Sequence, residues 1–181
     1  MSVGALLGVG LHERGGGAMA AELTLSTSSD EASISIGAAV GEAIHDSMVI
    51  ALYGEMGSGK TTFVRGLARG LGVSGVVNSP TYTLMQRYEG RLTLDHYDAW
   101  MEGREREVLA DGAHELFGRG GVSVIEWADR VQDWLPDERL EIHMRVTGLS
   151  DREVRIRWCS VAPEPPGGLK SLGDWSVPEG T

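Results

Sequence analysis

The sequence predicts a three-layer α/β fold with a mixed sheet, which has a parallel centre and antiparallel edge hairpins. Two mostly apolar runs, at residues 48–53 and 122–125, are typical of strands buried on both faces of a parallel sheet. Residues 139–146 and 153–158 alternate between apolar and polar side chains around a Gly-containing turn, as an antiparallel hairpin does. These observations together favour a sheet that mixes both kinds of strand pairing.

Length and composition indicate one globular domain. The chain has 181 residues and a mass of 19.4 kDa, with 41% hydrophobic and 23% charged residues, which is close to the average of soluble proteins. We expect one ordered domain at residues 22–160. Residues 1–21 are rich in glycine, and residues 161–181 are rich in proline and glycine, so we expect both to be flexible ends.

The charge balance argues against direct binding of nucleic acid. Sixteen Lys and Arg residues and 26 Asp and Glu residues give a formal net charge of −10, and such a surface repels phosphate backbones on average. A role in nucleic-acid chemistry should therefore pass through a partner protein. The lone Cys159 excludes an internal disulfide, and no apolar run approaches the roughly 20 residues of a membrane span, so we expect a cytoplasmic protein with no membrane contact.

The N-terminal half predicts a helix, a strand and a second helix in succession. The sequence Ser28-Ser29-Asp30-Glu31 has the spacing of a capping box, and apolar residues follow at helical intervals up to Ala43. The buried strand 48–53 comes next. Helical spacing returns between Phe63 and Leu71, and Gly72 is a typical helix end.

The C-terminal half predicts further strands. Residues 82–88 and 91–97 flank a Glu-Gly pair and are typical of a hairpin. A polar stretch at 100–117 is typical of a helix. The second buried strand, 122–125, then ends directly on Glu126.

The loop between strand 48–53 and its following helix has the pattern of a phosphate-binding P-loop. It reads GEMGSGKT from Gly54 to Thr61 and matches G-x-x-x-x-G-K-[ST] at every fixed position. Glycines let backbone N–H groups turn toward a polyphosphate, and the helix N-terminus adds partial positive charge. We therefore expect a P-loop NTPase-like fold, in which Lys60 reaches the β- and γ-phosphates and Thr61 ligates Mg²⁺. The expected phosphate-binding residues are Gly57, Ser58, Gly59, Lys60, Thr61 and Thr62.

The bound nucleotide is expected to be ATP. GTPases read guanine with an Asn-Lys-x-Asp segment, and the chain has only two lysines. Lys60 belongs to the P-loop, and Lys170 lies in a Gly-Leu-Lys-Ser segment that lacks the pattern.

Two acidic residues stand at strand ends, where carboxylates that hold Mg²⁺ often lie. Glu126 ends strand 122–125, and Asp98 follows strand 91–97. Asp95 is a lesser candidate, because alternation along a strand turns it away from His96. His96 could act as a general base, but a lone histidine on a strand is more often structural, and we favour that role.

Three further features have two interpretations each. Trp127 either packs in the core or docks a partner beside the metal carboxylate, and packing is the commoner role. Arg65 and Arg69 lie on one face of the P-loop helix and are either solvated, which is the ordinary expectation, or in contact with a partner. Ser79-Pro80-Thr81-Tyr82-Thr83 is either a turn that enters a strand or a switch whose hydroxyl senses the γ-phosphate.

Taken together, these segments resemble the bacterial ATPase family of tRNA threonylcarbamoyladenosine biosynthesis, known as TsaE or YjeE. The similarity spans roughly residues 28–145 and is carried by four segments in the order of that family. They are Gly54 to Phe63, Ser79-Pro80-Thr81-Tyr82-Thr83-Leu84, His96-Tyr97-Asp98 and Glu126-Trp127.

The resemblance implies a function and a set of site residues. It implies weak, Mg²⁺-dependent ATP hydrolysis in support of a tRNA-modifying heterodimer of TsaD and TsaB type, which makes threonylcarbamoyladenosine at position 37 of tRNAs that read ANN codons. Lys60 would hold phosphate, Thr61, Glu126 and Asp98 would hold Mg²⁺, and Asp98 could instead assist the attacking water. Thr81 would be the switch hydroxyl, and Ser28 would lie near adenine. The partners, rather than this acidic chain, would contact tRNA.

Two other function classes stay open on the sequence alone. A small-molecule kinase uses the same loop but needs an acceptor pocket and an arginine-rich lid, for which Arg104-Glu105-Arg106 is the candidate. A nucleotide-gated adaptor would use ATP only to order its switch, with incidental hydrolysis.

Overall fold

A computed structural model describes residues 20–80, 83–100, 103, 112–161 and 165–173. Within these ranges, seven strands form one sheet in the order β1-β7-β6-β2-β5-β4-β3. The strands are β1 (Ala20–Thr27), β2 (Met48–Tyr53), β3 (Met85–Tyr88), β4 (Thr93–Asp98), β5 (Gly121–Glu126), β6 (Arg139–Val146) and β7 (Arg152–Cys159).

The sheet has a parallel centre and antiparallel edges, which confirms the predicted fold class. Strand β2 pairs in parallel with both β5 and β6, and β4 pairs in parallel with β5. Strands β3, β7 and β1 each pair antiparallel with a neighbour. Because β2 lies inside the sheet, its side chains alternate between two cores: Ile50 and Leu52 face one, and Val49 and Ala51 face the other.

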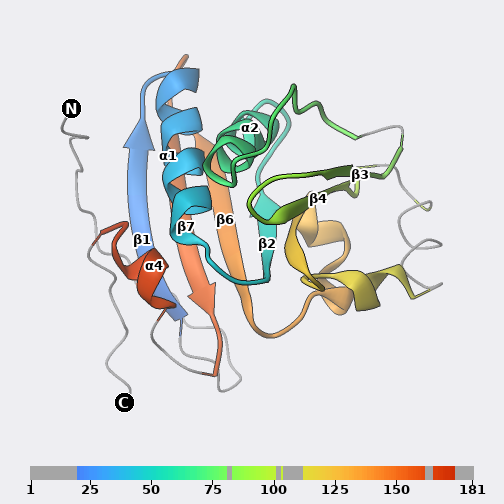
Figure 1. Cartoon of the computed structure of the whole chain (residues 1–181). Coiled ribbons are helices and arrows are strands. Elements are labelled where there is room, and N and C mark those ends of the chain that lie inside the picture. The colour runs from blue at the N-terminus through green and yellow to red at the C-terminus, as the bar shows by residue number, and fades with distance from the viewer. Residues whose placement is uncertain (1–19, 81–82, 101–102, 104–111, 162–164, 174–181) are drawn as a thin grey trace.

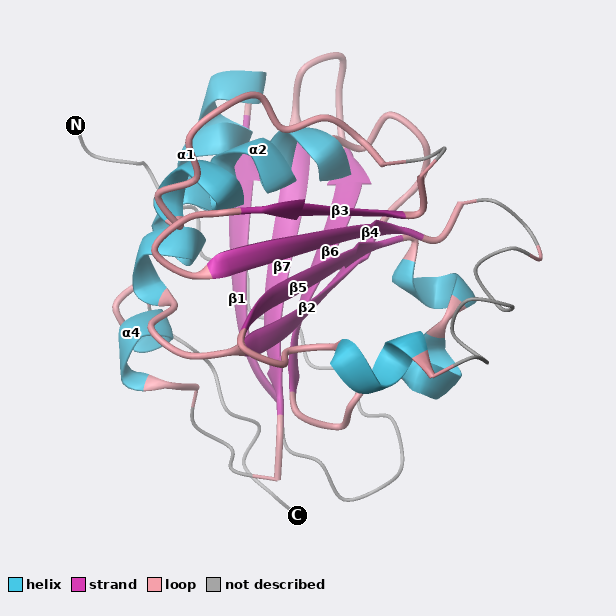
Figure 2. Ribbon diagram, turned by 45° about the vertical axis from the view of Figure 1, so that its right-hand side comes forward, coloured by secondary structure: helices cyan, strands magenta, loops and turns pink. Residues whose placement is uncertain are grey.

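Helices α1 (Asp30–Ala43) and α2 (Lys60–Gly70) cover one face of the sheet (Figure 1). Three 3₁₀ helices cover the other face near β2 and β5 (Figure 2). Residues in and beside these helices pack with side chains of the strands to form the smaller of the two cores. The three 3₁₀ helices are η1 (Ala113–Leu116), η2 (Ala128–Arg130) and η3 (Gln132–Trp134). The predicted third layer therefore consists, among the residues described, of 3₁₀ turns. No helix in those ranges has the length and apolar character that crossing a membrane requires.

The two long helices touch through glycines. A Cβ atom added at Gly37 or Gly41 of α1 would lie closer than 3.0 Å to the backbone of α2, and one added at Gly66 or Gly70 would meet the backbone of α1 in the same way. The helices therefore approach each other backbone to backbone. This contact fixes α2, and with it the loop that precedes α2, against the rest of the domain.

The start of α1 differs by one residue from the predicted capping box, in which Ser28 would be the cap and Glu31 its partner. The Ser29 hydroxyl accepts a hydrogen bond from the backbone N–H of Ala32 at 3.1 Å, and Asp30 and Glu31 occupy the first turn. The side-chain cap is thus Ser29.

The structure differs from the predicted boundaries at both ends of the domain. Ala20 and Ala21 belong to β1, so the paired strand begins before residue 22. In the expected tail, residues 167–170 form a short helix, α4 (Gly167–Lys170), whose Leu169 is fully buried in the main core beside α1. Leu169 anchors this segment because its apolar side chain leaves water. Most of the predicted helix 100–117 lies outside the described residues.

An ion-pair network stabilises the sheet face away from α1. The carboxylate of Glu141 on β6 contacts Arg139 at 2.6 Å, His143 at 3.1 Å and Arg157 of β7 at 3.3 Å. Burial alone would raise the pKa of Glu141, but the hydrogen bonds and charges of His143 and Arg139 lower it to about 2.

We predict that Gly66→Ala lowers the free energy of unfolding by about 1–3 kcal/mol, since the new methyl group meets the backbone of α1, which cannot rotate away. Urea denaturation would measure the change. Gly167→Ala is the control, because a Cβ atom there has no neighbour within 4 Å. Equal stability of the two variants would contradict the close helix contact.

We also predict acid sensitivity from Glu141. Its folded-state pKa lies below its ordinary value of 4.5, so its stabilising effect is complete above pH 4.5 and is lost as the pH falls toward 2. The effect is on the order of 3 kcal/mol at neutral pH. Glu141→Gln should flatten the dependence of unfolding free energy on pH in this window, whereas Glu31→Gln, at an exposed site, should not.

Candidate functional site

A glycine-rich loop leaves the carboxyl end of β2 and leads directly into α2. Gly54, Gly57 and Gly59 have φ values of 148°, 76° and 97°. These values lie in the region that side chains with a Cβ atom disfavour, so glycines allow the loop to turn sharply. Gly59 is also the N-cap of α2, which directs the free N–H groups of the first helical turn toward this edge of the sheet.

Lys60 is held inside its own loop. Its Nζ atom donates to the backbone oxygens of Gly54 at 2.7 Å and Glu55 at 3.0 Å. The ammonium group also lies 3.6 Å from the ring centroid of Trp127, and the residue is 5% exposed. Burial lowers the pKa of Lys60, and nearby carboxylates, Glu126 foremost, oppose that shift.

Two strand-end carboxylates lie next to the start of α2. Glu126 and Asp98 are the last residues of β5 and β4, and they are register partners in the parallel sheet. The Thr61 hydroxyl donates to the Glu126 carboxylate, at 2.9 Å from Oε1 and 3.1 Å from Oε2. Asp98 accepts hydrogen bonds from the Ser79 hydroxyl at 2.8 Å and from the Trp100 backbone N–H at 2.9 Å. Both acids are nearly inaccessible, with 3% and 4% exposure.

His96 contacts the same carboxylate group. Its Nε2 atom lies 2.9 Å from Oε1 of Glu126, and its side chain is fully buried. Alternation along β4 places His96 and Asp98 on one face and Asp95 on the other. Asp95 indeed pairs with Arg87, at 2.7 and 2.8 Å. Asp95 therefore stands apart from the candidate site.

An aromatic group lies beside Lys60. The rings of Trp127 and Trp100 are 4.3 Å apart, and Arg130 lies over Trp100 with its Cζ atom 4.7 Å from the ring centroid. Arg130 also donates to the Trp100 backbone oxygen at 2.9 Å. Sequence reasoning missed this group, since packing alone was favoured for Trp127 and Arg130 was not considered.

The other predicted site residues have different placements. Thr81 lies outside the described residues, as do Arg104, Glu105 and Arg106. Ser28 is exposed after β1, at the same edge of the sheet as the loop, but β7 and β6 lie between β1 and β2.

The P-loop residues themselves are brought together at the start of α2. Ser58 is fully buried, and its hydroxyl has no partner within the described ranges. Thr62 lies in the first turn of α2. Arg152 of β7 donates to the Gly57 backbone oxygen at 3.4 Å and so links the β6–β7 hairpin to the loop. Arg65 and Arg69 are exposed, as expected.

The chemistry of this edge suits a phosphate group and a hard cation. Glycine backbone, a lysine and a helix N-terminus are donors for phosphate. Thr61, Glu126 and Asp98 offer only oxygen atoms, which Mg²⁺ prefers, and Mg²⁺ commonly combines one or two carboxylates with substrate phosphates. In the part of the chain that the structure describes, no three His, Cys, Asp or Glu side chains cluster into a metal site by themselves. The residues present therefore fit a cation that a phosphate group helps to hold.

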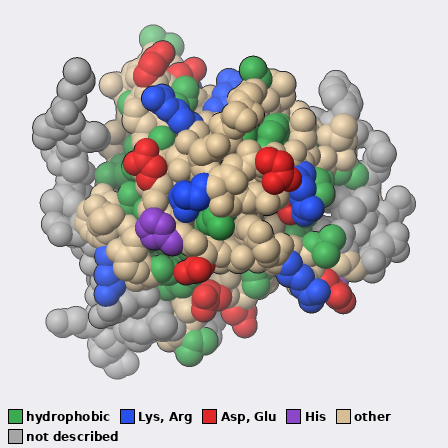
Figure 3. Space-filling model, in the orientation of Figure 1, with side chains coloured by type: hydrophobic (Ala, Val, Ile, Leu, Met, Phe, Trp, Pro, Cys, Tyr) green, Lys and Arg blue, Asp and Glu red, His purple; other side chains and the backbone are tan. Residues whose placement is uncertain are grey.

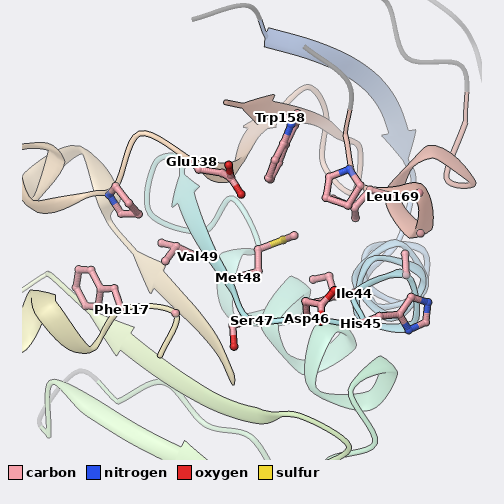
Figure 4. A pocket seen from close by; sticks show the side chains of 16 residues that line it. Ile44, His45, Asp46, Ser47, Met48, Val49, Phe117, Glu138, Trp158 and Leu169 are labelled. Atoms are coloured by element: carbon pink, nitrogen blue, oxygen red, sulfur yellow. The ribbon is translucent and has the colours of Figure 1, made fainter. Parts of the chain in front are cut away.

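A separate cavity of about 480 Å³ lies at the opposite edge of the sheet (Figure 4). It opens between the start of β2 at Met48, the end of β7 at Trp158, and α4, with Asp46 and Glu138 on its wall. The P-loop residues, Asp98 and Glu126 do not line this cavity. We assign the candidate site to the P-loop edge, because the glycine-rich loop, Lys60 and the carboxylates at two strand ends meet there.

The chain is similar to proteins of one family. The family model of the threonylcarbamoyl adenosine biosynthesis protein TsaE matches residues 27–154. A tRNA threonylcarbamoyladenosine biosynthesis protein TsaE of Treponema pallidum is 40% identical over 120 residues, which cover 66% of this chain and 89% of that protein. The TsaE protein of Bacillus subtilis is 43% identical over 107 residues, covering 59% of this chain and 66% of that protein.

A solved structure supports the same grouping. The crystal structure of Bacillus subtilis YdiB superimposes with a TM-score of 0.68 at 30% identity, covering 85% of this chain and 95% of that chain. The family model spans most of the described domain, including the P-loop and both strand-end acids. The chain therefore belongs to the TsaE family of tRNA threonylcarbamoyladenosine biosynthesis proteins.

Proposed function

We propose that this protein is a Mg²⁺-dependent ATPase that supports threonylcarbamoyl modification of adenosine 37 in tRNAs reading ANN codons. The observation that carries the proposal is the contact between Thr61, the P-loop residue after Lys60, and Glu126, which ends a neighbouring strand. This contact brings a phosphate loop and a carboxylate to one point, as an enzyme of phosphoryl transfer requires.

In this proposal, the loop from Gly57 to Thr62 holds the triphosphate. Backbone N–H groups and the N-terminus of α2 donate to phosphate oxygens, and the Lys60 ammonium neutralises their charge. Lys60 now donates to the Gly54 and Glu55 backbone oxygens, and this anchoring keeps its ammonium group within the loop.

Thr61, Glu126 and Asp98 would hold Mg²⁺. When bound, the ion neutralises charge that develops on the phosphate oxygens. The protein's own side chains would position the reacting groups and accept a proton. Asp98, fixed by Ser79 and by the Trp100 backbone, is placed to orient an attacking water or to assist the metal. Catalysis would then consist of positioning and charge neutralisation, with no covalent intermediate on the protein.

We propose that a heterodimer of TsaD and TsaB type is the partner and that tRNA is contacted only through it. The net charge of −10 disfavours direct tRNA binding. On the face seen in Figure 3, acidic side chains are interspersed among the basic ones, so this face offers no extended basic surface. ATP turnover would reset the modifying complex, and it should be fastest in the presence of the partners.

We expect Lys60→Ala to weaken ATP binding by roughly 100-fold or more, because the loop loses its charged donor. Calorimetry with ATP and Mg²⁺ would measure binding, and ATP hydrolysis would be assayed with and without the partner heterodimer and tRNA. Lys170→Ala is the matched control, since Lys170 is exposed on α4 and is the only other lysine. Hydrolysis by the Lys60 variant at the rate of the unmodified protein would contradict the mechanism.

We expect Glu126→Gln to weaken Mg²⁺ binding to the protein–ATP complex by roughly 10–100-fold and to leave the fold intact. Asp95→Asn is the control, because Asp95 is a buried carboxylate on the adjacent strand that faces away and pairs with Arg87. Mg²⁺ titrations of ATP binding would separate the two variants. An equal response of both would show that Glu126 is no metal ligand.

A further inference from the structure

The function proposed above leaves one buried group beside the metal-binding edge without a role. His96 of β4 is fully buried, and its Nε2 atom lies 2.9 Å from Oε1 of Glu126. The Glu126 carboxylate is thus held by two elements, α2 through Thr61 and β4 through His96. Thr61 and Glu126 are both proposed ligands of Mg²⁺, whereas His96 is not.

The hydrogen bond between His96 and Glu126 has one direction. A carboxylate accepts hydrogen bonds, so the Nε2 atom of His96 carries the proton and donates it. The other ring nitrogen, Nδ1, is buried and has no hydrogen-bond partner in the described part of the chain. A proton on Nδ1 would be an unsatisfied buried donor, so the surroundings favour a proton on Nε2, the atom that faces Glu126.

The two contacts of the Glu126 carboxylate differ in kind. The Thr61 hydroxyl, which donates to Glu126, is itself a proposed ligand, because its oxygen can face Mg²⁺ while its proton is still donated to the carboxylate. His96 is the contact of this carboxylate that comes from outside the proposed ligand set. Because its ring is enclosed by the core, it has no room to follow a moving carboxylate.

We propose that His96 is a positioning residue, which fixes the Glu126 carboxylate for Mg²⁺ through its Nε2–H group. This inference rests on the proposed function of the site, since it assumes that Glu126 binds the ion. His96 would touch neither nucleotide nor metal and would act only through Glu126.

Two substitutions that differ by one methylene group separate this role from a structural one. In His96→Gln the side-chain amide nitrogen replaces Nε2 and can still donate to Glu126, whereas in His96→Asn the shorter side chain cannot reach it. Both variants keep a neutral polar side chain in the core. The measured quantity is the ratio of ATP affinity in Mg²⁺ to ATP affinity in excess EDTA, which isolates the metal-dependent part of binding.

We expect His96→Asn to reduce this ratio by roughly 10–100-fold and His96→Gln to retain most of it. Affinity in EDTA should be the same in both, because the P-loop is untouched. The matched control is His143→Asn, which removes a histidine that contacts a glutamate on a strand, Glu141 at 3.1 Å, but lies on the sheet face opposite α2, where it stacks on Tyr53. It should leave the ratio unchanged.

A double variant tests whether His96 acts through Glu126. If it does, His96→Asn should lower the affinity ratio little further when Glu126→Gln is already present, so the two effects should not add. Full additivity would overturn the proposal. The ¹⁵N chemical shifts of His96 give a second measurement in the nucleotide-free protein, where a proton on Nε2 supports the proposal and a proton on Nδ1 alone overturns it.

The remaining outcomes are distinguishable. Equal ratios for the Asn variant and the unmodified protein, or an equal loss in Mg²⁺ and in EDTA, would overturn the role of His96 and leave the proposed ATPase standing. Absence of Mg²⁺-dependent ATP binding in the unmodified protein would instead overturn the proposed function, and this inference with it.

Discussion

The hydrogen bond between the Thr61 hydroxyl and the Glu126 carboxylate joins two parts of the chain that are 65 residues apart. It can form because β5 lies beside β2 and runs parallel to it, so both strands end at the same edge. The loop after β2 and the last residue of β5 are thereby brought to one place. The contacts of the site that cross strands depend on the sheet order in the same way, including the register pairing of Asp98 with Glu126 and the contact of His96 with the same carboxylate.

Burial explains why these side chains form a connected network. Lys60, His96, Asp98 and Glu126 are all at most 5% exposed, and polar groups removed from water are costly unless they are paired. Each has a partner on a different segment: the loop backbone, a strand, or the segment that follows α2. Such a network holds charged groups in fixed positions before any ligand arrives, which is what electrostatic catalysis demands.

Much of the centre of the fold could be read from sequence, because its signals are local. The apolar run of β2, the glycines after it and the alternation of β6 and β7 each lie within a few residues. The edge strand β1 is not among the predicted strands, although Ala21, Leu23 and Leu25 alternate with polar residues, because the preference of a segment for a strand depends on the neighbours against which it packs. Its pairing with β7 depends on residues more than 100 positions away.

The site shows the same division between local and distant information. The P-loop and the strand-end position of Glu126 are sequence patterns, whereas the contact of Trp127 with Lys60 is not. Trp127 has a φ of 58°, an uncommon conformation that turns the chain just after β5, and no propensity predicts it for tryptophan. The partner of the structural hydrogen bond expected for His96, Glu126, is likewise visible only once β5 is known to lie beside β4.

The glycine contact between α1 and α2 has a mechanical consequence. Where helices meet through long side chains, rotamer changes let one slide over the other, but Gly37, Gly41, Gly66 and Gly70 have no side chains to rearrange. Helix α2 therefore holds the P-loop, which precedes it in the chain, in a fixed position. We therefore expect any conformational change on ligand binding to occur in the segments that flank α1 and α2, while the two helices keep their arrangement relative to each other.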